Sequence, residues 1–140
     1  MLISGEKGYG ASRLFERRTA VPGSVAPLRA AVVDLAVQGG ATGEQRDLIA
    51  LAVSEALTNC AVHAYDEPGL PGPVTVEAWT EVGELTVIIS DEGRGMYPRV
   101  VSSGLGLGLG LIERVSEHVD FKPHTPDPGV SVHMSFLLGA

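Results

Sequence analysis

The sequence predicts an α+β fold, a two-layer sandwich in which helices cover one face of a mixed, mostly antiparallel sheet. Apolar residues recur at helical spacing in two segments between residues 25 and 65, and they alternate in short runs between residues 74 and 138. The chain has 140 residues, of which 44% are hydrophobic, so it can bury one core but is too short for two ordinary domains. We therefore expect a single domain over residues 1–140.

The N-terminal third predicts an arm, a strand and a helix. Residues 1–14 show no periodicity and predict a flexible arm, and residues 15–20 are expected to form a short edge strand. A helix should follow over residues 25–37, with Ser24 as a candidate N-cap and Pro27 in the first turn. A Gly-Gly pair ends it. The apolar residues that recur at helical spacing are Val25, Leu28, Val32 and Leu35.

The second helix has the strongest periodic signal in the chain. Thr42 and Gln45 fit a capping box, so the helix should begin there and continue to about Tyr65. One wide stripe of it is apolar and should be buried, with members Ile49, Ala50, Val53, Ala56, Leu57, Cys60, Ala61 and Ala64. A second row, which we expect to face away from the main core, contains polar residues spaced by four, namely Glu55, Asn59 and His63.

The C-terminal half alternates in the manner of strands. Two runs, 74–80 and 85–90, flank a turn at Gly83 and predict a hairpin. A glycine-rich stretch then precedes a helix expected over about 107–117 and a strand near 119–122. A last strand should direct one set of side chains to the core, namely Val130, Val132, Met134, Phe136 and Leu138.

Charge and cysteine content exclude several classes of partner. Ten Lys and Arg against seventeen Asp and Glu give a net charge of −7, which disfavours nucleic acids and anionic membrane surfaces. No apolar run approaches the roughly 20 residues of a spanning helix, and the first ten residues lack a secretory signal. A single cysteine, Cys60, cannot form an intramolecular disulfide, and its buried position favours a packed thiol over a reactive one. We expect a cytoplasmic protein.

Two segments carry polar residues suited to chemistry, and each has a simpler interpretation. Glu55 and Asn59 lie one helical turn apart, so an amide oxygen could ligate a hydrated cation beside a carboxylate that accepts a proton. A solvated helix face explains the same spacing. Asp91 ends a strand just before Gly93 and Gly95, where a tight turn would let a flat ligand approach and donate from an amino group. A simple turn shows the same pattern.

A third segment alternates glycine with leucine immediately before a helix, at Gly104, Gly106, Gly108 and Gly110. Backbone N–H groups beside a helix N-terminus suit phosphate oxygens. The patterns of dinucleotide folds and Walker loops do not fit, because no strand directly precedes the glycines and no Lys follows them. Sliding the pattern by two residues changes little, so the register of phosphate contacts within 104–110 stays open.

In this order the three segments resemble the N box, the D-x-G-x-G box and the G-x-G box of the GHKL ATPase superfamily. The likeness is greatest to the bacterial anti-sigma-factor serine/threonine-protein kinases, and EALTNCAVHAY and GLGLGLIERVSEHVD carry it. It covers about residues 15–138. The resemblance implies a Bergerat ATP-binding fold that holds ATP and Mg²⁺ between the second helix, the sheet and a lid.

The resemblance also implies roles by motif position. Asn59 would ligate Mg²⁺, Glu55 would act as general base on an incoming hydroxyl, and Asp91 would bond the adenine amino group. The glycines would form the adenine pocket (Gly93 and Gly95) and the phosphate site (Gly104, Gly106 and Gly108).

This chain departs from the family pattern in two places. Only eight residues separate Gly95 of the D-x-G-x-G box from Gly104 of the G-x-G box, so any lid is short. Arg99 is the candidate for an arginine that touches the γ-phosphate. Arg94 is the second choice. Near the last strand the family usually has Gly-Thr, whereas this chain has Gly-Val-Ser. Either Ser131 supplies the hydroxyl one position late, or the contact is lost.

By this resemblance the protein would be an ATP- and Mg-dependent protein serine/threonine kinase that regulates transcription by partner switching. Its substrate would be a hydroxyl on a small antagonist of the anti-sigma factor. A sigma factor could be a further partner, and the protein could form a homodimer. The alternative is a module that binds ATP and sequesters a sigma factor or another regulator without phosphotransfer. Glu55 favours the kinase and the short lid favours the module. A histidine kinase is disfavoured, because 140 residues leave no room for a separate dimerisation helix.

Overall fold

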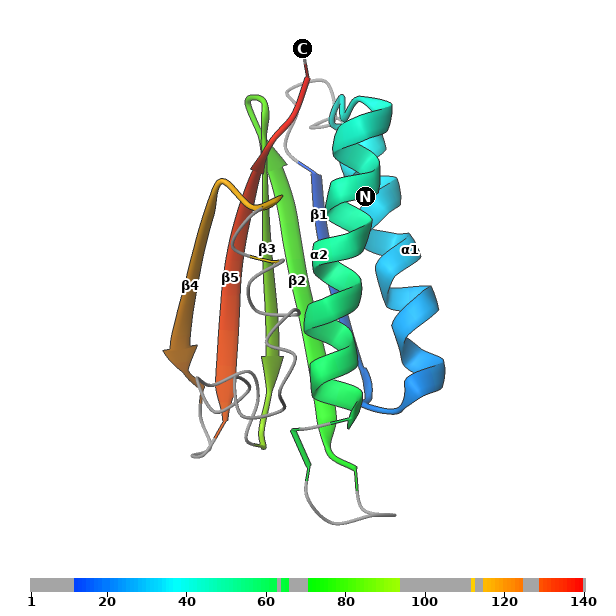
Figure 1. Ribbon diagram of the computed structural model, residues 1–140, viewed down its shortest axis with the longest axis vertical. Coiled ribbons are helices and arrows are strands. Elements are labelled where there is room, and N and C mark those ends of the chain that lie inside the picture. Colours follow the sequence, from blue (N-terminus) through cyan, green and yellow to red (C-terminus); the bar gives the residue numbers. More distant parts are fainter. Residues whose placement is uncertain are drawn as a thin grey trace.

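A computed structural model describes residues 12–62, 64–65, 71–93, 112, 115–124 and 129–139. They form a five-stranded sheet in the order β1-β2-β3-β5-β4, and all four pairings are antiparallel. Helices α1 and α2 lie together on one face of it (Figure 1). The predicted two-layer α+β sandwich is thus confirmed. In chain order the elements are β1 (Ser12–Thr19), α1 (Pro22–Gln38), α2 (Gly43–Val62), β2 (Pro73–Glu81), β3 (Glu84–Asp91), β4 (His118–Pro123) and β5 (Val130–Leu137).

The first strand begins earlier than the sequence predicted. Residues 12–14 belong to β1, so this part of the expected arm is wrong, and residues 1–11 lie outside the described residues. The strand pairs with β2 along its whole length, which places Arg13 opposite Trp79. The Arg13 guanidinium carbon lies 5.1 Å from the Trp79 ring centroid, within the range of a cation–π contact.

Helix α1 also begins earlier than expected, because its cap is Val21 and not Ser24. Ser24 occupies the third helical position, where its hydroxyl donates to the Val21 carbonyl at 2.7 Å and accepts from the Val21 N–H at 3.3 Å. The hydroxyl thus adds to the backbone bonds that these two groups already make, in which the Val21 carbonyl accepts from the Ser24 N–H and the Val21 N–H donates to Thr19. Of the predicted apolar stripe, Leu28, Val32 and Leu35 are buried, and Val25 is partly buried against the same core.

Helix α2 begins with the capping box that the sequence predicted. The Thr42 N–H donates to Gln45 Oε1 at 2.9 Å, and the Gln45 N–H donates to Thr42 Oγ1 at 3.1 Å. The helix ends at Val62, a few residues before the expected end. The expectation that the polar row faces away from the core is wrong at Asn59, which is only 6% exposed. Helix α2 packs across β2, β3 and β5, and burial on the helix depends on such tertiary contacts, which the spacing of residues does not show.

The hairpin of β2 and β3 matches the predicted pair of strands. Val82 and Gly83 form its two-residue turn, with φ values of 34° and 76°. Positive φ at both positions is the signature of a type I′ turn, which suits the twist of the paired strands. The Leu138 N–H donates to the Gly83 carbonyl at 2.8 Å and ties the end of the chain to this turn. The five predicted core residues of the last strand are all buried.

The helix predicted over 107–117 lies mostly outside the described residues. Ile112 and Val115 are helical, and the Ser116 N–H donates to the Ile112 carbonyl at 3.0 Å, as one helical turn requires. Ile112 is fully buried in the core that the helices and sheet share. In the part of the chain that the structure describes, neither helix has the length and apolarity needed to cross a membrane.

Candidate functional site

The candidate site lies where the C-terminal end of α2 meets the end of β3. Asp91 is the last residue of β3 and is only 2% exposed. Its Oδ1 accepts the Gly93 N–H at 2.9 Å, and its Oδ2 lies 3.6 Å from the Cys60 thiol on α2. A buried carboxylate needs such donors, because its desolvation is costly. The fold thus holds Asp91 in one orientation, beside the helix that carries Glu55 and Asn59.

Cys60 is a donor to this carboxylate. Burial raises the pKa of the Cys60 thiol well above its ordinary value of 9.0, and the charge of Asp91 and the hydrogen bond to it act in the same direction. The thiol therefore stays protonated at neutral pH. The predicted packed thiol is confirmed, since Cys60 is a free, buried cysteine. Its contact with Asp91 could not be seen in the sequence, because the two residues are 31 positions apart.

Asn59 is held by the helix on which it lies. Its Nδ2 donates to the Glu55 carbonyl at 2.8 Å, and because the amide group is planar, its oxygen points away from that carbonyl. An amide oxygen is a hard ligand of the kind that Mg²⁺ accepts, and Mg²⁺ usually takes few protein ligands besides substrate phosphates. Asn59 therefore fits an Mg²⁺ ligand. Among the described residues, no group of three or more His, Cys, Asp or Glu is arranged to hold a metal ion.

Gly93 has a steric reason to be glycine. A Cβ at this position would overlap the Ala64 carbonyl oxygen and stand 2.8 Å from its carbon. The chain just after α2 thus passes directly against the turn that follows β3. Only a residue without a side chain permits this approach, which is also what brings Asp91 to Cys60.

Tyr65 joins the same segments, and the sequence did not indicate it. Its hydroxyl donates to the Pro73 carbonyl at 2.6 Å and accepts the Glu92 N–H at 2.8 Å. Burial, reinforced by the charges of Asp91, Cys60 and Glu92 and opposed by the bond from the Glu92 N–H, raises the pKa of Tyr65 to about 12. The phenol therefore stays neutral and can donate and accept at the same time.

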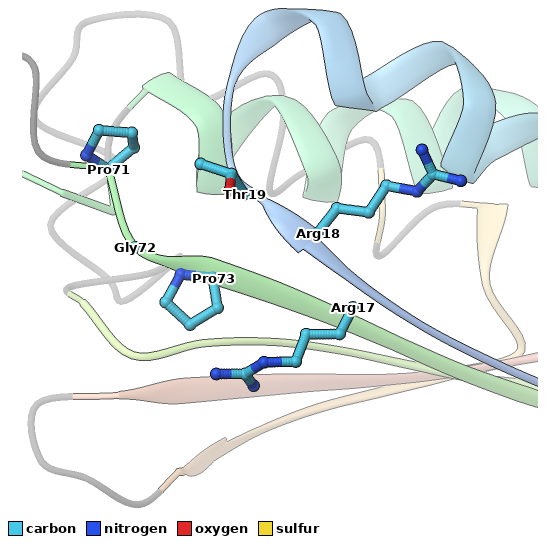
Figure 2. Close-up of a pocket in the computed structure, with 6 residues that line it drawn as sticks. All are labelled: Arg17, Arg18, Thr19, Pro71, Gly72 and Pro73. Atoms are coloured by element: carbon cyan, nitrogen blue, oxygen red, sulfur yellow. The ribbon is translucent and has the colours of Figure 1, made fainter.

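A surface pocket of about 370 Å³ lies beside these residues, between the end of β1 and the start of β2 (Figure 2). It is lined by Arg17, Arg18, Thr19, Pro71, Gly72 and Pro73. The two arginine side chains extend in different directions, so they do not converge on one anion. Arg17 Nη2 lies 3.6 Å from Glu92 Oε2, which links β1 to the turn after Asp91. Among the predicted site residues that the structure describes, none lines this pocket.

The structure does not bring Ser131 to Asp91. Ser131 lies opposite Ser90 in the sheet, and the two hydroxyl oxygens are 2.7 Å apart. Because neighbouring residues of a strand face opposite sides, Ser90 and Ser131 lie on the face opposite Asp91. The other predicted positions lie outside the described residues, and they are Gly95, Arg99, Gly104, Gly106, Gly108, the second-choice Arg94, and His63.

The sequence profile of the histidine kinase-like ATPase domain family matches residues 19–136, which includes the Asn59 helix and the Asp91 turn. The chain belongs to this family. This histidine kinase-like ATPase domain is 29% identical over 123 residues to the anti-sigma F factor of Thermoanaerobacter sp. (strain X514), covering 80% of this chain and 84% of that protein. It is 31% identical over 134 residues to the serine-protein kinase RsbW of Bacillus subtilis (strain 168), covering 85% and 81%.

Solved structures show the same fold. The RsbU and RsbW domains of Rv1364c from Mycobacterium tuberculosis superpose with a TM-score of 0.68 at 19% identity. The match covers 91% of this chain and 32% of that longer chain. At this identity the likeness concerns the arrangement of helices and strands, which agrees with the two-layer sandwich of Figure 1.

Proposed function

We propose that this histidine kinase-like ATPase domain is an ATP- and Mg-dependent protein serine/threonine kinase of the anti-sigma type. One observation carries the proposal, the buried Asp91 carboxylate held by Gly93 and Cys60 beside the Asn59 helix. A carboxylate is an acceptor only, so it selects a ligand edge that donates, such as the exocyclic amino group of adenine. Guanine presents a carbonyl oxygen at that position and should bind less well.

Glu55 is the proposed general base. It is partly buried one turn before Asn59, so a hydroxyl near an ion on Asn59 would come within its reach, directly or through one water. In the proposed step, the hydroxyl oxygen of a partner Ser or Thr bonds to the γ-phosphorus, the bond to the bridging oxygen breaks, and ADP leaves while Glu55 takes the hydroxyl proton. Mg²⁺ held through Asn59 and phosphate oxygens would neutralise part of the phosphate charge.

The names of the relatives support the class of substrate. Relatives named anti-sigma F factor and serine-protein kinase RsbW suggest a phosphoacceptor on a small antagonist protein, and a sigma factor as the protein that the kinase releases or holds. We expect the reaction to take place in the cytoplasm. Ser131 has no part in the proposed site, because its hydroxyl is bonded to Ser90 on the other face of the sheet.

The first experiment tests the nucleotide. Asp91→Asn replaces a strong acceptor by a group that also donates, so the Kd for ATP should rise by roughly 5- to 150-fold, equivalent to about 1–3 kcal/mol. The preference for ATP over GTP should shrink with it. Calorimetry on the wild type, on Asp91→Asn and on a control variant, Gln45→Ala at the other end of α2, measures this. A wild type that does not bind ATP would overturn the proposal.

The second experiment separates the kinase from a sequestering module. Glu55→Gln keeps the size of the side chain and removes the base, so ATP binding should be nearly unchanged while phosphate transfer falls by roughly 10²- to 10⁴-fold. Asn59→Ala should lose Mg²⁺-dependent binding and transfer together. The acceptor is the protein captured from the native cell with ATP present. A wild type that binds ATP and this partner but labels no Ser or Thr on it would favour the sequestering module.

A further inference from the structure

Tyr65 connects three segments that are far apart in the chain. It follows the end of α2, its hydroxyl donates to Pro73 at the start of β2, and the same hydroxyl accepts from Glu92 in the turn after β3. Both bonds are short, at 2.6 and 2.8 Å. A phenol can do both at once only while it is neutral, and the raised pKa of Tyr65, about 12, keeps it so.

Two glycines make room for the ring of Tyr65. A Cβ at Gly72 would overlap the ring and stand 2.8 Å from its hydroxyl oxygen, and a Cβ at Gly93 would stand 2.9 Å from its Cδ1. The ring therefore lies against backbone on both the segment before β2 and the turn after β3. Close contact of this kind restricts both segments, because neither can shift without displacing the ring.

Tyr65 binds the backbone N–H of Glu92, the residue between Asp91 and Gly93. Glu92 is bracketed by Asp91, whose carboxylate faces Cys60, and by Gly93, whose N–H binds that carboxylate. We infer that Tyr65 is a positioning residue for nucleotide recognition, which holds the turn that orients the Asp91 carboxylate toward the adenine amino group. This inference rests on the proposed function.

The ion pair between Arg17 and Glu92 is a second, weaker contact that restrains the turn after β3. Arg17 lies 3.6 Å from the Glu92 carboxylate, but its side chain is 55% exposed, so water and salt screen the pair. Its Nη1 also lies 3.5 Å from Thr75 Oγ1, at the limit of a hydrogen bond. The phenol therefore restricts the turn more than the arginine, and its loss should have the larger effect on ligand affinity.

The test compares Tyr65→Phe with the wild type and with Gln45→Ala. The phenylalanine keeps the ring and loses both hydrogen bonds, so the Kd for ATP should rise by roughly 3- to 10-fold. The rate of phosphate transfer at saturating ATP should stay within twofold, because Glu55 and Asn59 are untouched. Gln45→Ala also destabilises the protein, but at the other end of α2, and should leave the Kd unchanged. Gly72→Ala displaces the ring by a different route and should raise the Kd in the same direction.

A measurement without nucleotide tests the hold itself. The Glu92 amide should exchange its hydrogen faster in Tyr65→Phe than in the wild type, because the acceptor of that amide is gone. An equal Kd for ATP in Tyr65→Phe and the wild type would overturn the inference, even if Tyr65→Phe unfolds at a lower temperature. If the wild type binds no ATP, the proposed function fails, but hydrogen exchange still tests the role of Tyr65. Unchanged exchange of the Glu92 amide in Tyr65→Phe would show that Tyr65 does not hold the turn.

Discussion

The two ends of α2 satisfy their polar groups in different ways. At the N-terminal end, Gln45 exchanges hydrogen bonds with Thr42 and also binds both backbone groups of Gly139, at 2.8 and 2.9 Å. These groups are exposed or partly buried. At the C-terminal end, Asn59 and Asp91 are buried, and the partners of Asp91 include a thiol of α2 and a backbone N–H of its own turn.

The difference shows where this fold can bind a ligand. At the N-terminal end, Gln45 is bonded to Thr42 and to Gly139, so these bonds stabilise the helix and its contact with the segment after β5. A buried carboxylate is costly to desolvate, and it is tolerated only where surrounding donors hold it. Such groups occur at functional sites more often than elsewhere. Substitutions at the C-terminal end should therefore lower ligand affinity, whereas those at the N-terminal end should change stability and leave ligand affinity unchanged.

Gly93→Ala should have the largest effect, and it should affect both properties. The new Cβ would overlap the Ala64 carbonyl oxygen, so the free energy of unfolding should fall by about 1–3 kcal/mol as the turn and the end of α2 separate. ATP affinity should fall as well. Urea unfolding and calorimetry measure the two. Gly23→Ala is the matched control, because nothing lies within 4 Å of its Cβ. Equal stability of both variants would show that the close approach is not required.

Gln45→Ala should separate stability from binding. It removes the bonds to Thr42 and Gly139, so the free energy of unfolding should fall by about 1–2 kcal/mol, while the Kd for ATP stays that of the wild type. Urea unfolding with a parallel ATP titration checks both values. A raised Kd in this variant would contradict the assignment of the two ends to different roles.

The C-terminal end of α2 should also make the protein sensitive to alkali. The pKa of Cys60 is raised above 9.0 and that of Tyr65 from 10.0 to about 12, so the folded state holds these protons more tightly than the unfolded state. The stability that they contribute is complete below about pH 9 and is lost as the pH rises toward 12. The free energy of unfolding, measured in urea between pH 8 and 11, should fall less steeply with pH for Cys60→Ala than for the wild type. Parallel curves would argue against the buried thiol as a cause.

Val82→Asn should have the smallest effect and should stabilise. Val82 is 99% exposed and has a φ of 34°, a conformation that a β-branched residue adopts with strain. Asn followed by Gly is the preferred pair in a type I′ turn, so the free energy of unfolding should rise by roughly 0.5–1 kcal/mol. This turn lies at the capping-box end of the molecule, where Leu138 binds Gly83, so ATP affinity should not change. Thermal unfolding of the variant measures the gain, and a lower melting temperature would contradict it.

The helices and strands of the described residues could be predicted because their signals are local. Spacing by three and four residues predicted α1 and α2, alternation predicted β2, β3 and β5, and a hydroxyl three residues before Gln45 predicted the cap. The boundaries were less accurate. Ser24 was predicted as the cap of α1, but it lies three residues after the cap, Val21, and bonds back to it. A serine that caps a helix and a serine inside its first turn look alike in the sequence.

The sequence by itself determined which residue types are present at the site and the order in which they occur. Glu55 and Asn59 had to share a side of α2, because one turn of helix separates them. Only the tertiary structure decided that Asn59 is buried, that Cys60 donates to Asp91, that Tyr65 holds Glu92, and that Ser131 lies against Ser90. These contacts join residues between 27 and 41 positions apart. Helical and strand periodicity report which side of an element a residue occupies, and they carry no information about which other element packs against that side.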